Sequence, residues 1–562
     1  MRNLRKVTLL VLGFGLAAGA QPFIDGHTNG HGARSAATYF PPSLPSGGIA
    51  RGSFFAVFGS GLGPAAGVEV STYPLQTAFN GVSVSVSQGS TKVAAIPYYV
   101  SATQVNLIMP SNAPLGRVLV QLTYNGQSSN VVPATVVAAN FGILTINGGG
   151  FGPGIFTDYI SAASQPVNSL TQTAAPDQVV TMWGTGLGPV PQDNVQASPG
   201  DLASQVEVFV GGVSARVDYH GRSPCCTGLD QIVFTVPANA PQGCYVPVTV
   251  RTNGASGTVS NTATMAIVAQ TGAPCSDSYN ALESAAVAGQ SIGAVTADRV
   301  DTAVSGIVGG SSEVTTDNAA AAAFSPVTGP SSAFFYNPLI SLPPLGTCTT
   351  FAADYDMLGT LTVPGELAGG ALLDAGPALT IAAGANQQQI APASLLYGAL
   401  LGGSDPNSFT SPLFFNPPGS VTVTVPGGAV GGFTARVPTT APLTWTNRSS
   451  LTSVNRGQPL TVNWTTAGQT NSTVVIAGTN FDTPNSASGM FVCTAPASAG
   501  TFTVPALEMA NLPATGANTA LATGFVGLAL VPLSSPANFS AANLGAGFGL
   551  YTSWLLQSVV WQ

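Results

Sequence analysis

Short segments of alternating apolar and polar residues recur along the chain. Val82-Ser-Val-Ser-Val86 alternates with a period of two, as expected for a strand with one buried and one hydrated face. The apolar runs Phe54–Phe58 and Val179–Trp183 end at glycine-rich turns. Val118–Leu122 precedes Asn125-Gly126, a dipeptide typical of tight hairpins. Short strands with frequent turn signals predict an all-β chain of tandem immunoglobulin-like β-sandwiches.

Several landmarks occur twice, in the same order and at nearly constant spacing. Phe58-Gly-Ser-Gly-Leu-Gly-Pro64 matches Trp183-Gly-Thr-Gly-Leu-Gly-Pro189. The segments that begin at Gln104 and Gln231 share the pattern P-x-x-x-P-x-G, and a later Ser-Asn pair (129–130) recurs at 260–261. The chain therefore contains a duplicated domain of about 100 residues.

These landmarks carry a resemblance to known domains. The glycine-rich turn, the P-x-x-x-P-x-G segment and the late Ser-Asn pair resemble IPT/TIG-type immunoglobulin-like domains. With Ser223-Pro-Cys-Cys-Thr-Gly-Leu-Asp-Gln231 included, the arrangement is similar to secreted acidobacterial proteins of unknown function, the Solibacter-type C-terminal domain family. The resemblance covers residues 40–270, and it implies export and fold but no catalytic residues. Unlike the usual family pattern, a long further region follows the repeat.

The patterns divide the chain into seven segments. Residues 1–20 read as a signal peptide, because Arg2, Arg5 and Lys6 precede an apolar stretch and the cleavage site Ala18-Gly-Ala20. The others are a flexible leader (21–39), a first sandwich (40–140), a linker (141–165), a second sandwich (166–270), a linker or small β layer rich in Ala, Ser and Gly (271–345), and a larger β-rich C-terminal sandwich region (346–562). No later segment is long and apolar enough to predict a transmembrane helix after signal cleavage.

The cysteines predict a disulfide-bonded, exported protein. All six follow the export signal, and an even number in an exported chain favours disulfides. Four lie within residues 225–275, which predicts two bridges there with the connectivity left open, and the other two would pair across a long loop. No C-x-x-C spacing indicates zinc. The disulfide candidates are Cys225, Cys226, Cys244, Cys275, Cys348 and Cys493.

Composition narrows the choice of partner. Only 6% of residues are charged and the formal net charge is −8, so nucleic acid is an improbable partner. A neutral, hydrogen-bonding surface suits uncharged polymers, since sugar rings stack on aromatic side chains, and it permits self-association. The aromatic binding candidates are Tyr98, Tyr99 and Tyr336, with packing in a core or a domain junction as the alternative.

No catalytic set assembles in the sequence. Gly289-Gln-Ser-Ile-Gly293 fits the G-x-S-x-G pattern, but all three histidines precede it. Asp354 and Asp356, or Asp298 and Asp301, could supply the two carboxylates of a glycosidase. We predict no catalytic residue, metal or cofactor.

The sequence thus favours a secreted or cell-surface, non-enzymatic binding, adhesive or scaffold protein. The expected partner is an extracellular, uncharged polysaccharide or a surface protein. One alternative is a secreted glycan-active hydrolase whose C-terminal region is catalytic. Another is a subunit of an outer-surface assembly.

Overall fold

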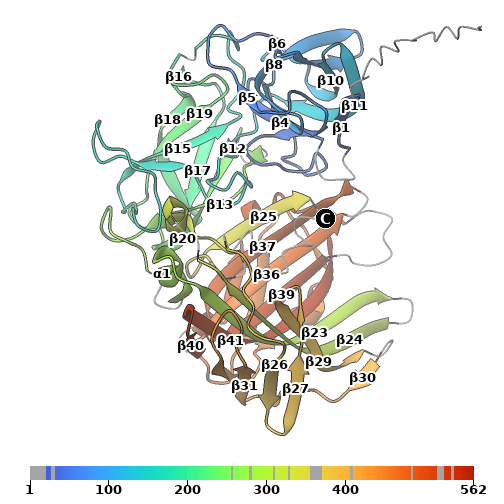
Figure 1. Ribbon diagram of the computed structural model, residues 1–562, viewed down its shortest axis with the longest axis vertical. Coiled ribbons are helices and arrows are strands. Elements are labelled where there is room, and N and C mark those ends of the chain that lie inside the picture. The colour runs from blue at the N-terminus through green and yellow to red at the C-terminus, as the bar shows by residue number, and fades with distance from the viewer. Residues whose placement is uncertain are drawn as a thin grey trace, which may run out of the picture.

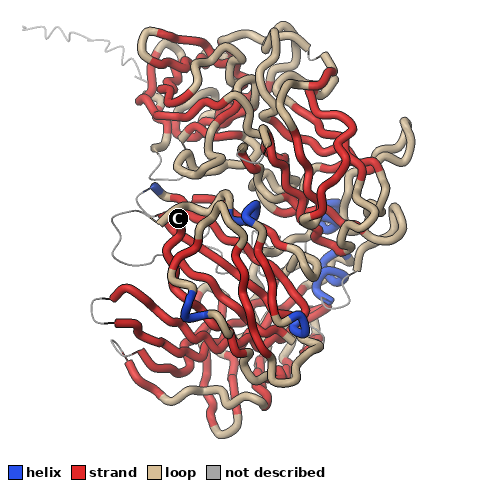
Figure 2. The backbone as a smooth tube through the Cα atoms, turned by 180° about the vertical axis from the view of Figure 1, so that it is seen from behind, coloured by secondary structure: helices blue, strands red, loops and turns tan. Residues whose placement is uncertain are grey.

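The computed structural model describes residues 21–562 except 27–31, 197, 255–256, 277–280, 308–309, 327–328, 339, 355–369, 406–408, 483–484, 516–523 and 533–536. The predicted signal peptide (1–20) therefore lies outside the described residues. The chain is all-β: two immunoglobulin-like β-sandwiches lie at one end and a larger β-rich body lies at the other (Figure 1). Helices are few and short in the described residues, and Figure 2 shows them beside the strands of the sheets.

The first sandwich forms from eleven strands in the hydrogen-bonded order β1-β4-β9-β8-β7-β10-β11-β3, with β2, β5 and β6 at the edges. Strand β8 takes part in both layers of the sandwich. Its residues 91–95 pair with β7, and its residues 96–100 pair with β9 and, at their end, with β5. The strands are β1 (Phe23–Ile24), β2 (Ala33–Ser35), β3 (Ile49–Ala50), β4 (Phe54–Ser60), β5 (Val68–Glu69), β6 (Ala78–Phe79), β7 (Val82–Gln88), β8 (Thr91–Val100), β9 (Gln104–Ile108), β10 (Gly116–Tyr124) and β11 (Gln127–Val137).

The second sandwich repeats this topology in the order β12-β15-β19-β18-β17-β20-β22-β13. Its core is apolar side chains from both layers, such as Met182, Phe234 and Val248. The strands are β12 (Gly142–Ile143), β13 (Gly152–Pro153), β14 (Phe156–Asp158), β15 (Val179–Thr185), β16 (Gly200–Asp201), β17 (Val206–Val210), β18 (Val213–Arg222), β19 (Asp230–Thr235), β20 (Gly243–Thr252), β21 (Thr258–Val259) and β22 (Ala263–Ile267).

The repeated Ser-Asn pairs have the same structural role in both sandwiches. The Asn130 side chain accepts a hydrogen bond from the Ile24 N–H (2.7 Å) and donates to the Ile24 carbonyl (2.8 Å). Asn261 makes the same two bonds to Ile143, at 2.8 and 2.9 Å. Each asparagine thereby satisfies the backbone N–H and the backbone carbonyl of one residue in the first strand of its sandwich.

These contacts change two predicted boundaries. In place of a flexible leader at 21–39, the described residues include β1 and β2, which pair with β4. In place of a linker at 141–165, the chain forms β12, β13 and β14. Strands of two or three residues show no readable alternation, and tertiary hydrogen bonds hold them, so the pattern of the chain did not reveal them.

The C-terminal body has a central sheet in the order β25-β37-β36-β39-β41-β23-β24-β29-β28, with a four-stranded sheet (β27-β26-β31-β32) and a three-stranded sheet (β33-β35-β38). Its strands are β23 (Ile292–Ile307), β24 (Gly310–Phe324), β25 (Cys348–Asp354), β26 (Leu379–Ala383), β27 (Asn386–Ile390), β28 (Pro392–Ala393), β29 (Leu396–Asp405), β30 (Phe409–Ser411), β31 (Gly419–Val425), β32 (Phe433–Thr439), β33 (Thr444–Trp445), β34 (Ser453–Val454), β35 (Leu460–Thr465), β36 (Thr473–Asp482), β37 (Ala487–Pro496), β38 (Thr501–Val504), β39 (Gly524–Val531), β40 (Ala537–Ala541) and β41 (Leu544–Trp561).

The range predicted as a linker or small layer (271–345) divides between two parts of the chain. Gly272 N–H donates to the Thr173 carbonyl and Cys275 bonds to Cys244, so this end belongs to the second sandwich, whereas β23 and β24 belong to the C-terminal body. Strand β23 pairs in parallel with β41 from Ile292↔Ala546 to Ala303↔Gln557, so it lies in the middle of the central sheet. The alanine run of β24 packs beneath the four-stranded sheet, where Ala319 and Ala323 are buried with Ile381. Small side chains there reflect close packing of two sheets and not a loose connection.

Candidate binding surfaces

The outer face of the second sandwich carries a row of uncharged side chains. In β15, Val180 and Met182 enter the core, so Val179, Thr181 and Trp183 point outward. The partner strands contribute outward positions in register, with Gln231 opposite Trp183 on β19. On the other side of β15, Thr157 of β14 lies opposite Thr181.

Two aromatic side chains of this face are held in defined orientations. The Tyr219 hydroxyl donates toward the Arg222 carbonyl (2.7 Å) and the Gly200 carbonyl (3.2 Å), and it accepts from the Gly200 N–H (3.0 Å). A Cβ at Gly221 would lie 2.7 Å from that hydroxyl, so the tyrosine occupies space that any side chain there would fill. On β15, the Trp183 indole N–H lies 3.4 Å from the Thr157 hydroxyl.

The first sandwich repeats this constellation. Phe58 lies opposite Gln104 as Trp183 lies opposite Gln231. Tyr99 lies opposite Asn106, just after a bulge in β8, as Tyr219 lies opposite Val233 after a bulge in β18. Each sandwich thus presents an aromatic side chain, a glutamine and a tyrosine on three adjacent strands.

The first sandwich covers part of its own face, in contrast to the second. Arg34 and Ala56 point outward from β2 and β4 yet are 2% and 0% exposed, and Arg34 donates to the Tyr39 carbonyl at 3.0 Å. The Tyr39 ring lies 6.0 Å from the Phe58 ring. Tyr99, one of the predicted binding residues, is half-buried beside Gly67.

Tyr98, the neighbouring candidate, occupies the bulge in β8. Its ring packs edge-on against Phe54 with centroids 5.1 Å apart, in a small cluster with Leu75 and Ile108. Burial and the nearby Glu69 carboxylate raise the pKa of Tyr98. Tyr98 and Tyr99 do not form one exposed aromatic platform.

Tyr336 lies in a domain junction, so its prediction as a binding residue is wrong. It is 6% exposed and packs edge-on against Tyr245, with ring centroids 5.3 Å apart. The surrounding cluster joins Leu170 of the second sandwich to Leu282 and Phe335 of the C-terminal body. The apolar side chains of residues far apart in sequence enclose this ring, which local sequence could not reveal.

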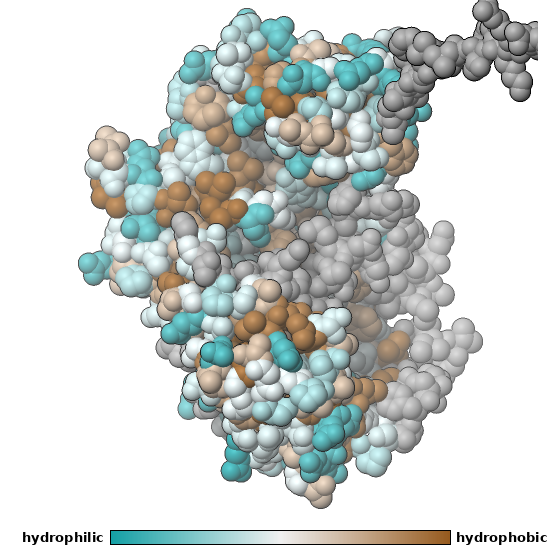
Figure 3. Space-filling model, viewed as in Figure 1, coloured by the Kyte–Doolittle hydropathy of each residue, from teal (hydrophilic) through white to brown (hydrophobic). Residues whose placement is uncertain are grey.

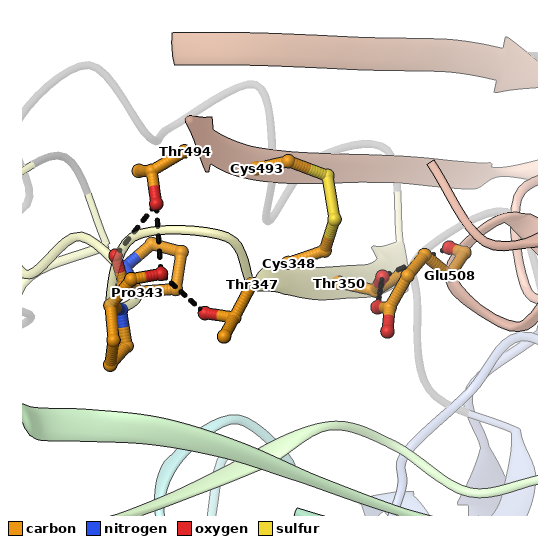
Figure 4. The surroundings of a disulfide bond; sticks show 8 residues. Pro343, Thr347, Cys348, Thr350, Cys493, Thr494 and Glu508 are labelled. Carbon is orange, nitrogen blue, oxygen red and sulfur yellow. Dashed lines mark hydrogen bonds between the residues drawn. A yellow bond between two sulfur atoms is a disulfide. The ribbon is translucent and has the colours of Figure 1, made fainter. Parts of the chain in front are cut away.

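The six candidate cysteines form three disulfides: Cys225–Cys226, Cys244–Cys275 and Cys348–Cys493. The pairing of Cys348 with Cys493 is the one that the sequence predicted, and the structure places the two cysteines directly opposite each other on β25 and β37. Near it, the Thr350 hydroxyl lies 2.9 Å from both the carbonyl and a carboxylate oxygen of Glu508 (Figure 4). Burial raises the pKa of Glu508 to about 7, and the Thr350 bond opposes that rise.

The adjacent-cysteine bridge lies in a loop at the junction of the two sandwiches. The Thr227 N–H donates to the Tyr73 hydroxyl across the junction (3.3 Å), and Thr185 donates to the Gly228 carbonyl (2.7 Å). The same Thr185 hydroxyl accepts from the Phe54 N–H of the first sandwich at 2.9 Å. These bonds hold the loop against both sandwiches.

A buried ion pair reinforces this junction. Arg222 Nη1 lies 2.5 Å from Asp230 Oδ1, and Arg222 Nη2 donates to the carbonyls of Gly52 (2.7 Å) and Gly188 (3.0 Å). The other Asp230 oxygen accepts from the N–H groups of Gly186 and Leu187. Burial raises the pKa of Asp230, and Arg222 and these bonds oppose the rise. The glycine-rich turn thus binds a carboxylate of its own chain.

The predicted glycosidase carboxylates are not assembled among the described side chains. Asp356 and the Asp354 side chain lie outside the described residues. Asp298 and Asp301 are three apart in β23 and therefore point to opposite faces. Asp298 accepts from the Thr552 hydroxyl, whereas Asp301 pairs with Arg448 at 2.9 Å.

A groove of about 480 Å³ lies where all three parts of the chain meet. It is lined by Pro45 and Ser46, by the hairpin residues Asn253, Gly257, Thr258 and Val259, and by Ala510. Arg251 and Arg456 border the adjoining hollow. Arg251 already holds Glu207 through two bonds of 2.7 and 2.8 Å, so this cation is neutralised by its own sandwich.

No family model matches the chain, and no curated protein matches it. Among solved structures, a tetra-tandem repeat from the extending region of a large adhesion protein matches at 12% identity and a TM-score of 0.13, over 89% of this chain and 95% of that one. A Bacteroides ovatus SGBP-B, in complex with a mixed-linkage heptasaccharide, matches at 10% identity and a TM-score of 0.14, over 84% and 96%. The match to the plexin A4 extracellular region (14% identity, TM-score 0.15) covers 44% of this chain and only 18% of plexin. Likenesses this weak carry no argument about function.

No helix in the described part of the chain is long and apolar enough to cross a membrane.

Proposed function

We propose that this chain is a secreted or cell-surface protein with a non-enzymatic binding, adhesive or scaffold role. The observation that carries the proposal is the buried polar junction between the sandwiches. Arg222 of the second sandwich donates to the Gly52 carbonyl of the first at 2.7 Å, and the Asn140 N–H of the first donates to the Gly186 carbonyl of the second at 2.8 Å. Such bonds hold the two sandwiches in one orientation, which suits a protein that presents a fixed surface to a partner.

Three disulfides accord with export, because such bonds persist in oxidising compartments. The IPT/TIG-like resemblance of the duplicated domain belongs to the same proposal. The partner class that we propose is an uncharged polysaccharide. The chain has few charged residues and many hydroxyl and amide side chains, which can form hydrogen bonds with sugar hydroxyl groups.

The test is a panel of soluble and insoluble polysaccharides incubated with the purified exported chain. Retention on a neutral polymer without release of sugar ends is the expected result. Release of sugar ends that Asp354→Ala abolishes would instead establish the alternative, a glycan-active hydrolase. A protein that binds no polymer of the panel would overturn the polysaccharide partner.

Self-association is tested separately by light scattering over a range of protein concentrations. A mass that grows with concentration supports a surface-assembly role. A chain that stays monomeric at high concentration counts against that role and leaves the binding role standing.

A further inference from the structure

We propose that the outer face of β14, β15, β19 and β18 in the second sandwich is the binding site for a neutral polysaccharide, with Trp183 and Tyr219 as the stacking residues and Gln231 between them. This inference rests on the proposed function and assigns it a place.

The geometry suits an extended chain of sugar rings. Strands β15 and β18 are separated only by β19, so the backbones that carry Trp183 and Tyr219 lie about 10 Å apart. Gln231 stands opposite Trp183 on one side and opposite Gly221 on the other. An amide that can both donate and accept thus lies between two aromatic rings.

The aromatic side chains are prepared for binding before a ligand arrives. Three backbone contacts fix the Tyr219 hydroxyl, and the absence of a side chain at Gly221 leaves room for the tyrosine. A ring held in this way loses little conformational entropy when a sugar stacks on it. Both residues are half-buried.

The chemistry of the face selects a neutral ligand. Thr157, Thr181 and Thr235 add hydroxyl groups to the outward positions of the strands. Arg216 and Asp218 of β18 neutralise each other through an ion pair of 2.9 Å. Thr235 donates to that same Asp218 carboxylate at 2.9 Å. An anionic polymer would find no free cation in this row.

The face has one open and one closed end. At the open end, Tyr159, Ile160 and Val167 are 47%, 50% and 37% exposed. At the other end, Thr185 is fully buried beneath Phe54 of the first sandwich. Hydrophobic side chains gather on the second sandwich in the view of Figure 3. The first sandwich therefore bounds the face at the end next to Trp183, and the opposite end is open.

The test is affinity electrophoresis and calorimetry of the full chain with neutral mixed-linkage glucan, xyloglucan and galactomannan, and with polygalacturonate as the anionic comparison. Trp183→Ala and Tyr219→Ala should each weaken binding of the retained neutral polymer about tenfold or more. Tyr219→Phe keeps the ring and should retain most of the affinity. Phe23→Ala, which removes an aromatic side chain 49% exposed in the first sandwich, is the matched control and should change nothing.

The outcomes separate this site from the broader proposal. A neutral polymer that binds the wild type and both alanine variants equally overturns the site and leaves the polysaccharide function intact. Failure of the wild type to bind any neutral polymer overturns both. Equal binding of polygalacturonate overturns the neutral ligand class, and loss of self-association in Trp183→Ala without any glycan effect would assign the face to a second copy of the chain. Far-ultraviolet circular dichroism confirms that each variant is folded.

Discussion

Asp158 should make the second sandwich more stable in mild acid than at neutral pH. Its side chain is 0% exposed on the inner side of β14, and its carboxylate oxygens lie 3.1 and 3.4 Å from the Asn168 amide nitrogen. Burial raises the pKa of Asp158 from 3.8 to about 7, against the opposing effect of the Asn168 bond. Between these two values the folded state holds a proton that the unfolded state has lost, so stability falls as pH rises through this window and levels off above it.

The magnitude follows from the two pKa values. Between pH 5 and pH 8 the free energy of unfolding should fall by about 2 to 3 kcal/mol because of this one group. Asp158→Asn removes the titration and keeps an acceptor for the Asn168 amide. The stability of the variant relative to the wild type should therefore grow by the same amount between pH 5 and pH 8.

Urea unfolding followed by circular dichroism at several pH values measures this difference. Comparison of variant with wild type at each pH cancels other titrating groups, such as Glu508. Thr157→Ala, a neighbouring substitution on β14 that removes no ionisable group, is the control and should show no such pH-dependent gain. A difference between Asp158→Asn and wild type that stays constant, or shrinks toward pH 8, would refute the reasoning.

Four further substitutions test the junctions and the repeat. Arg222→Met leaves the buried Asp230 uncompensated and should cost about 3 to 5 kcal/mol, visible as a lower unfolding temperature of the sandwiches in calorimetry. Tyr336→Ala should destabilise the contact between the second sandwich and the C-terminal body by about 3 to 5 kcal/mol. Polysaccharide retention should stay unchanged, because the Tyr336 ring is buried. Loss of retention in a folded variant would contradict the assignment of Tyr336 to the junction. Asn130→Ala and Asn261→Ala should each lower the free energy of unfolding by about 1 to 3 kcal/mol and speed amide hydrogen exchange at Ile24 and Ile143 respectively. Unchanged exchange in both variants would refute the role given to these asparagine hydrogen bonds.

The alternation of apolar and polar residues predicted a strand correctly where the strand has one solvent-exposed face and is long enough for the alternation to be recognised. Val82–Val86 alternates in the sequence and its valines are buried in the structure. The Asn125-Gly126 turn follows β10 with positive φ at both residues (49° and 82°), as the hairpin dipeptide predicted. The aromatic binding residues were predicted less well, because the sequence near an aromatic residue does not show whether its side chain faces solvent or a domain junction. Tyr336 was placed in a core by side chains from two other regions of the chain.

The two stacking residues that we propose, Trp183 and Tyr219, have a signal in the sequence. They stand where Phe58 and Tyr99 stand in the first copy, so superposing the two repeats on their shared glycine turns and glutamines would have singled them out. The bulge that places each tyrosine outward shifts the alternation by one residue, which hides the equivalence from simple periodicity.

By itself, the sequence determined the all-β class, the duplication and the presence of disulfide-forming cysteines, because alternation, turn dipeptides and cysteine number are local or countable properties. Only the tertiary structure decided that residues 23–24 and 142–143 are strands, that β23 lies beside β41, and which aromatic rings remain at a surface. Those outcomes depend on contacts between segments far apart in the chain. Hydrogen-bond partners and burial belong to such pairs of segments, and no single segment encodes them alone.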